Sequence, residues 1–244
     1  MIDTHAHLDA LADAPAAIAR ARAAGVDRIV AIGSGVASAR TTLAIAAEAD
    51  GVFVAAGIHP HQAADAESVA ELAALADGKV VAIGEIGLDF FRDYAPRAEQ
   101  RRLFVEQLDL ARELQKPVVV HTRAADEETA SLLERFDGTV VMHCFSSPAL
   151  LPVALERGYY VSFAGNVTYA NAAELRAAAA AVPHDRLLVE TDCPYLAPQP
   201  VRGRTNEPAY VRYTIDALAE ARGEGRDELA LRIDANAATA FALP

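Results

Sequence analysis

Eight short apolar segments alternate with alanine- and leucine-rich segments along the chain, and this alternation constrains the fold more than any other feature. Most of the apolar segments are near-continuous, which is typical of parallel strands covered on both faces. Eight strand–helix units in 244 residues predict an α/β protein with one (β/α)8 TIM-barrel domain over residues 1–244. An open, doubly wound sheet is the alternative, but no Gly-x-Gly-x-x-Gly follows the first predicted strand. The predicted strands are residues 2–7, 27–33, 52–58, 79–86, 117–122, 139–144, 159–164 and 186–192.

Composition and charge narrow the possible classes of protein. The chain is 52% hydrophobic, enough for a full-sized core, and has no uninterrupted apolar tract long enough for a membrane span. The net charge of −12 counts against tight binding of nucleic acid through the global field of the protein. It does not exclude an enzyme whose metal ions supply positive charge locally, so we expect no membrane association and no required protein partner.

The two cysteines, Cys144 and Cys193, suit a reducing compartment and argue against a disulfide framework. The first predicted strand starts at Ile2 and leaves no room for a signal peptide, so we expect a cytoplasmic protein. Cys144 directly follows His143, and Cys193 directly follows Asp192. His143 and Asp192 are candidate site residues, so the alternation of side chains along a strand would turn each cysteine away from the site. We therefore predict that both are buried packing residues rather than nucleophiles.

Most of the histidines gather at the carboxyl ends of the predicted strands. His5 and His7 lie two residues apart and would point to the same face of the first strand. Of the seven histidines, only His184 lies away from the carboxyl end of a predicted strand. Active sites of closed α/β barrels are built at the carboxyl ends of several strands. The candidate site residues are His5, His7, His59, His61, Glu85, His121, His143 and Asp192.

The donor types of this cluster predict a metal centre. Six of these residues are the candidate metal ligands: His5, His7, His121, His143, Glu85 and Asp192. Their four imidazoles and two carboxylates are too many ligands for one tetrahedral zinc ion, but they suit two divalent ions that share a carboxylate. Glu85, from the fourth strand, lies between the two groups of histidines and is the natural bridge. The ions would outweigh the two carboxylates, so the site would attract anions inside an acidic protein. His/carboxylate sites accept Zn, Mg or Mn, so the identity of the metal stays open.

Six motifs occur in order over nearly the whole chain: IDTHAHLD, GIHPH, AIGEIGLDFFRD, HTR, MHCFS and VETDCPYLAPQPVRGRTNEP. Together they resemble the TatD family of metal-dependent deoxyribonucleases, within the amidohydrolase-like barrels. The resemblance implies hydrolysis of phosphodiester bonds in DNA, often from the 3′ end, with DNA as a substrate rather than a stable partner. It also implies the two ligand sets, which are His5, His7, Glu85 and Asp192 for one ion and Glu85, His121 and His143 for the second.

The chain departs from the family pattern at two positions that are not ligands. Ala6 stands between the first two histidines, where a cysteine is common. Ala124 follows the HTR motif, where an acidic residue is common. We expect the metal ligands to be unaffected, whereas Ala124 bears either on the support behind the ligands or on the fit of the substrate.

Catalytic and substrate-binding roles follow from these positions. Asp192 is predicted to accept the proton of the attacking water and Glu85 to bridge the ions. His61 and Arg202 are predicted to contact phosphate. The aromatic residues of the enlarged loop 88–96 serve either packing or base stacking.

Two other functions stay open on this evidence. The same barrel and metal cluster could hydrolyse a small amide, ester or lactone, because one fold hosts many chemistries. A non-catalytic metal-binding scaffold is the second alternative, against which the complete set of six ligands argues.

Overall fold

The computed structural model describes residues 1–65, 68–76, 78–92 and 94–244. Eight parallel strands form one sheet in the order β1 to β8, so each strand lies beside its neighbours in the sequence. The predicted (β/α)8 barrel is confirmed, and each of the eight predicted segments overlaps one strand. The strands are β1 (Ile2–Ala6), β2 (Arg28–Ser34), β3 (Val52–Gly57), β4 (Val80–Asp89), β5 (Val118–Arg123), β6 (Val140–Met142), β7 (Tyr160–Phe163) and β8 (Leu187–Val189).

Main-chain hydrogen bonds between β1 and the segment after β8 close the sheet. Ala6 pairs in parallel with Cys193. The amide of Asp192 donates to the carbonyl of His5 at 2.9 Å, and the amide of His7 donates to the carbonyl of Cys193 at 2.8 Å. The closure therefore runs through the segments that carry three of the predicted ligands.

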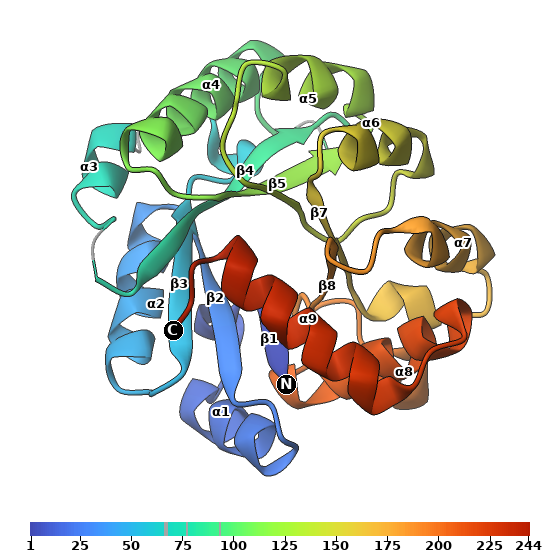
Figure 1. The fold of residues 1–244 in the computed structure, drawn as a ribbon. Helices are drawn as coiled ribbons and strands as arrows, with labels where there is room; N and C mark the ends of the chain where they lie inside the picture. The colour runs from blue at the N-terminus through green and yellow to red at the C-terminus, as the bar shows by residue number, and fades with distance from the viewer. Residues whose placement is uncertain (66–67, 77, 93) are drawn as a thin grey trace.

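Helices surround the barrel, and the last one crosses one end of it (Figure 1). In this last helix, Asn236 donates from Nδ2 to the carbonyls of His184 and Leu187 at 2.8 and 2.9 Å, so the helix covers the amino ends of the strands. Among the described residues, no helix is long and apolar enough to cross a membrane. The helices are α1 (Ala14–Ala23), α2 (Val36–Ala47), α3 (Val69–Ala73), α4 (Arg97–Glu113), α5 (Asp126–Leu133), α6 (Leu151–Glu156), α7 (Ala173–Ala181), α8 (Val211–Arg222) and α9 (Arg226–Ala240).

Strand β4 differs from its prediction, because it continues to Asp89 and does not end near Glu85. Gly84 pairs with Val119 and Ile86 pairs with Val120, so Glu85 is an extra residue in β4 at a β-bulge. The neighbouring glycine is needed there, since a Cβ on Gly84 would lie 2.5 Å from the Val119 side chain. The bulge directs the Glu85 side chain toward the carboxyl end of the barrel although its strand runs on.

Candidate metal centre

The predicted site residues lie in and beneath one pocket of about 870 Å³ at the carboxyl ends of the strands. His5 is fully buried under it. The structure thus brings the six predicted metal ligands together from five different strands or the turns that follow them. The predicted site residues that line the pocket are His7, His59, His61, Glu85, His121, His143 and Asp192.

The first set of ligand atoms, the β1 group, consists of His5, His7, Asp192 and one oxygen of Glu85. The Nε2 atoms of His5 and His7 lie 3.3 Å apart. Glu85 Oε2 lies 3.5 Å from His5 Nε2 and 3.8 Å from His7 Nε2. Asp192 Oδ1 lies 3.8 Å and 3.5 Å from the same two nitrogens. Two imidazoles and two carboxylates therefore converge on one point, a donor set that suits a divalent cation.

The second set, the β5–β6 group, consists of His121, His143 and the other oxygen of Glu85. Glu85 Oε1 lies 2.8 Å from His121 Nδ1 and 3.0 Å from His143 Nε2. The Glu85 carboxylate thus turns one oxygen to each group, as a bridging ligand would. The two groups are also in direct contact, because the rings of His5 and His143 stack with centroids 3.8 Å apart.

Burial and mutual charge set the protonation of these groups. Burial would raise the pKa of Glu85, but the facing histidines, His143 foremost, hold that pKa well below its ordinary value. Burial lowers the pKa of His5 to about 3. Burial also disfavours charged His143, yet the carboxylates of Glu85 and Glu190 raise its pKa well above the ordinary value. Without a metal, protons therefore compensate the Glu85 charge, and a cation would replace them.

Two buried carboxylates that the sequence analysis did not single out stand behind the β5–β6 group. Glu190 Oε1 accepts a hydrogen bond from His143 Nδ1 at 2.9 Å. Asp89 Oδ2 lies 3.2 Å from His121 Nε2. Such outer carboxylates fix the orientation of metal-binding imidazoles, so each ring keeps its other nitrogen facing Glu85. The signal for both was present, because Asp89 ends the GEIGLD stretch and Glu190 opens the ETD stretch.

His59 and His61 lie at the edge of the β5–β6 group. His59 Nε2 lies 3.3 Å from Glu85 Oε1, which brings it within metal-binding distance of the cluster. However, His59 Nδ1 accepts a hydrogen bond from the His61 amide at 3.1 Å. The neutral His59 ring must then carry its proton on Nε2, where it donates to Glu85 and offers no lone pair. His61 Nε2 lies 2.8 Å from Asp89 Oδ2, so its contact with phosphate stays a prediction.

Arg202 and His184 lie away from the ligand groups. The Arg202 guanidinium lies 4.1 Å from the ring centroid of Tyr169 and is not part of the pocket lining, so its contact with phosphate also stays a prediction. His184 is exposed, and its Nδ1 lies 3.4 Å from Glu224 Oε1.

The two cysteines differ from each other in their surroundings. Both are free, and Cys193 is buried as predicted. Cys144 instead lines the metal pocket, because β6 ends at Met142 and the positive φ of 44° at Cys144 breaks the strand alternation. Burial raises the pKa of both thiols well above the ordinary value, which keeps them protonated and poorly nucleophilic.

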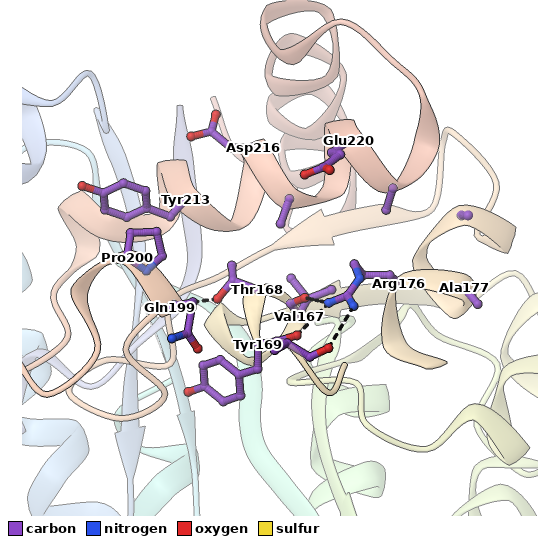
Figure 2. Close-up of a pocket in the computed structure, with 14 residues that line it drawn as sticks. Val167, Thr168, Tyr169, Arg176, Ala177, Gln199, Pro200, Tyr213, Asp216 and Glu220 are labelled. Atoms are coloured by element: carbon purple, nitrogen blue, oxygen red, sulfur yellow. Dashed lines mark hydrogen bonds between the residues drawn. The ribbon is translucent and has the colours of Figure 1, made fainter. Parts of the chain in front are cut away.

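A second pocket, of about 770 Å³, lies between α7 and α8 (Figure 2). The described residues that line it include no histidine or cysteine. Its Arg176 donates to the carbonyls of Val167 and Tyr169 at 3.0 and 2.8 Å, and its Asp216 pairs with Arg226 at 2.7 Å. These charged groups serve the packing of the helices and do not form a set of metal ligands.

Comparison with known proteins agrees with this geometry. The sequence profile of the family described as TatD related DNase matches residues 2–242. An uncharacterized metal-dependent hydrolase of Bacillus subtilis, YabD, is 38% identical, with 99% of this chain and 98% of that protein covered. The 3′-5′ ssDNA/RNA exonuclease TatD of Cronobacter sakazakii is 40% identical, with 92% and 90% covered. The crystal structure of YJJV, a TatD homologue from Escherichia coli K12, superposes with a TM-score of 0.94 at 33% identity, covering 100% and 98% of the two chains.

Proposed function

This chain belongs to the TatD-related DNase family and is a metal-dependent hydrolase, and from that premise we propose that it is a deoxyribonuclease that removes nucleotides from the 3′ end of single-stranded DNA. The observation that carries the proposal is the Glu85 carboxylate, which turns one oxygen to each of two ligand groups at the mouth of the barrel. The name of the Cronobacter relative supports the choice of substrate and of strand end.

The donor set fits two divalent ions, Zn, Mg or Mn. The β1 group would hold one ion and the β5–β6 group the other, with Glu85 shared between them. When bound, such ions promote ionisation of a water and stabilise negative charge on phosphoryl oxygens. The outer carboxylates Asp89 and Glu190 keep the imidazoles of the β5–β6 group in register for this task.

Asp192 is our candidate for the acceptor of the water proton. Its carboxylate lines the pocket, and 13% of the side chain is exposed, so solvent reaches it. The hydrogen bond from its amide to the His5 carbonyl holds its main chain in place, and its φ of +56° is left-handed, in the segment after β8. A fixed carboxylate within reach of the attacking water can take its proton during attack.

The charge distribution supports a substrate that is bound only locally. The net charge of −12 repels DNA over most of the surface. Arg92 and Arg123 nevertheless line the metal pocket, and no ion pair of either side chain occurs among the described residues. DNA is therefore a substrate and not a stable partner, and the two free cysteines suit the cytoplasm.

Digestion of end-labelled DNA tests the proposal. The metal-supplemented protein should shorten a 5′-labelled single strand into a ladder from its 3′ end, faster than it shortens a duplex. A chelator should stop the reaction, and Asp192→Asn should slow it about a hundredfold or more while the protein stays folded. Hydrolysis of a panel of small esters and lactones with no cleavage of DNA would instead identify a small-molecule hydrolase. If the protein turns over none of these substrates, the remaining interpretation is a non-catalytic metal-binding scaffold.

A further inference from the structure

An exposed aromatic rim adjoins the metal pocket. Six large apolar side chains are exposed among the described residues, and three of them are the aromatic residues Phe91, Tyr94 and Tyr195 beside this pocket. Phe91 and Tyr94, in the loop after β4, expose 61% and 63% of their surface. Packing therefore accounts for only part of each ring, and the exposed part can cover an apolar surface of a ligand.

Two arginines stand beside these rings. The Arg123 guanidinium lies 4.1 Å from the ring centroid of Phe91, and both Arg92 and Arg123 line the metal pocket. The Tyr94 ring meets the edge of His61 with centroids 4.8 Å apart. We call Phe91, Arg92, Tyr94 and Arg123 the platform. Neither arginine makes an ion pair with a described residue, and aromatic faces next to such arginines are the combination by which proteins hold single-stranded nucleic acid.

The platform is fixed to the metal centre through Asp89. Asp89 Oδ1 accepts hydrogen bonds from the amides of Phe91 and Arg92, both at 2.9 Å. Gln100 Nε2 donates to the carbonyls of Asp89 and Ala95 at 3.1 and 2.9 Å, which secures the other end of the loop. Because Asp89 also contacts His121, one carboxylate joins the main chain of the platform to the β5–β6 group.

The opposite side of the pocket carries negative charge. Asp9, just after β1, lines the pocket there and accepts a hydrogen bond from the Ser38 hydroxyl at 2.5 Å. In a closed barrel of eight strands in chain order, β1 lies across from β5, which carries Arg123. A polynucleotide has many phosphates on one side of a cleaved terminal bond and none on the other. The phosphate-rich side therefore belongs over the platform, and the terminal nucleoside belongs beside Asp9.

We propose that the platform stacks a base of an unpaired strand on the 5′ side of the scissile bond, with Phe91 as the ring that carries the base. This inference rests on the proposed function, since it assigns the strand that the nuclease retains after each cleavage. It explains a preference for single strands, because a paired base cannot offer its face to Phe91. The pocket-facing arginines neutralise the adjoining phosphates.

A thermodynamic cycle between the base and the ring tests this proposal. We would titrate the metal-loaded protein with fluorescent oligothymidylate whose 3′-terminal linkages are phosphorothioates that resist cleavage. The strand is used intact and with a single abasic site at each of the four 3′-terminal positions in turn. Phe91→Leu should weaken binding of the intact strand about tenfold, a typical value for loss of one stacked base. With the abasic site at the stacked position, the same substitution should cost almost nothing.

The position of the coupling tests the orientation of the strand. The coupling between base and ring should be largest at an internal position and absent at the 3′-terminal nucleotide. Leu231→Ala, which alters a residue 72% exposed on α9 at the other end of the barrel, is the matched control and should change no dissociation constant. Coupling that is largest at the terminal nucleotide would overturn the orientation, and no coupling at any position would overturn stacking on Phe91.

The outcome separates this inference from the function on which it rests. If the protein degrades single strands from the 3′ end but shows no coupling, the proposed nuclease function is supported and base stacking on the platform is rejected. If coupling is found but the protein cleaves no nucleic acid, the platform is supported as a surface that binds single strands and the proposed nuclease function is rejected.

Discussion

The two halves of the candidate metal centre are held in place by different means. In the β1 group, the main chain does the positioning, because the hydrogen bonds of His5 and His7 to the segment after β8 are the bonds that close the barrel. The His5 ring has no outer partner, since its Nδ1 is buried without a hydrogen bond among the described residues. The geometry of the β1 group therefore depends on the integrity of the whole barrel.

In the β5–β6 group, side chains do the positioning. His121 and His143 each meet a buried carboxylate, Asp89 or Glu190, on the nitrogen that faces away from Glu85. From this comparison we expect that a single substitution of Asp89 or Glu190 loosens the β5–β6 group without unfolding the protein. The β1 group lacks such an adjustable support, so we expect its ion to be retained when the other is lost.

Removal of the shared ligand should have the largest effect. Glu85→Gln takes a charged oxygen from both groups, so metal content should fall below that of His143→Ala. Phosphodiesterase activity should fall about a thousandfold or more. Elemental analysis of the folded variants gives the answer, with the exposed Glu113→Gln as the matched control. Two tightly held ions in Glu85→Gln would show that Glu85 is not the bridge.

Removal of a ligand from one side should separate the groups. His143→Ala leaves His5, His7, Glu85 and Asp192 intact, so the variant should bind one divalent ion per chain in place of two. Isothermal titration with the metal measures the stoichiometry. A variant that binds no ion, although its circular dichroism matches wild type, would contradict the independence of the β1 group.

A change behind the ligands should have a smaller effect. Glu190→Gln keeps the size of the side chain but removes the charge that His143 Nδ1 faces. Affinity for one of the two ions should fall about 10–100-fold, and the other should be unchanged. Competition with a chelator of known affinity measures both constants, and equal weakening of the two would erase the contrast between the groups.

Acidification should produce the mildest difference. In the metal-free protein the pKa of His143 is raised well above its ordinary value, where Glu85 and Glu190 outweigh burial, whereas burial lowers the pKa of His5 to about 3. Against the effect of burial, the carboxylates of Asp192 and Glu85 also raise the pKa of His7 in the β1 group. Those of Asp89 and Glu85 likewise raise the pKa of His121 in the β5–β6 group. A metal therefore competes with protons on both histidines of the β5–β6 group but on only one histidine of the β1 group. Affinity of the β5–β6 group should fall about tenfold more per pH unit than that of the β1 group as the pH decreases, and its ion should leave first. Metal titrations at several pH values measure both affinities. An equal decline of the two affinities with decreasing pH would contradict this prediction.

The barrel and the clustering of the candidate ligands at its mouth could be predicted because strands covered on both faces admit few polar residues. Histidines such as His121 and His143 stand out at the ends of apolar runs, and the fold brings those ends together. Glu85 marks the limit of this reasoning, because the bulge that places it depends on the register between β4 and β5. Register is a property of paired strands that one segment does not reveal.

The outer carboxylates could not be assigned for another reason. Asp89 and Glu190 resemble further ligands when only their position in the chain is known. Their role depends on which imidazole nitrogen each one meets, and side-chain packing in three dimensions decides that. The same holds for His59, whose hydrogen bond from the His61 amide determines where its proton lies.

The loop between Asp89 and Gln100 has a consequence for how such an enzyme can diverge. Its ends are secured by the hydrogen bonds of these two buried side chains, and every candidate metal ligand comes from outside it. Mutation can therefore replace Phe91, Arg92 or Tyr94 without disturbing the barrel or its ions. Descendants of one ancestor can in this way keep the hydrolytic chemistry while selection rewrites the substrate they accept, and this loop is where such lineages should differ most.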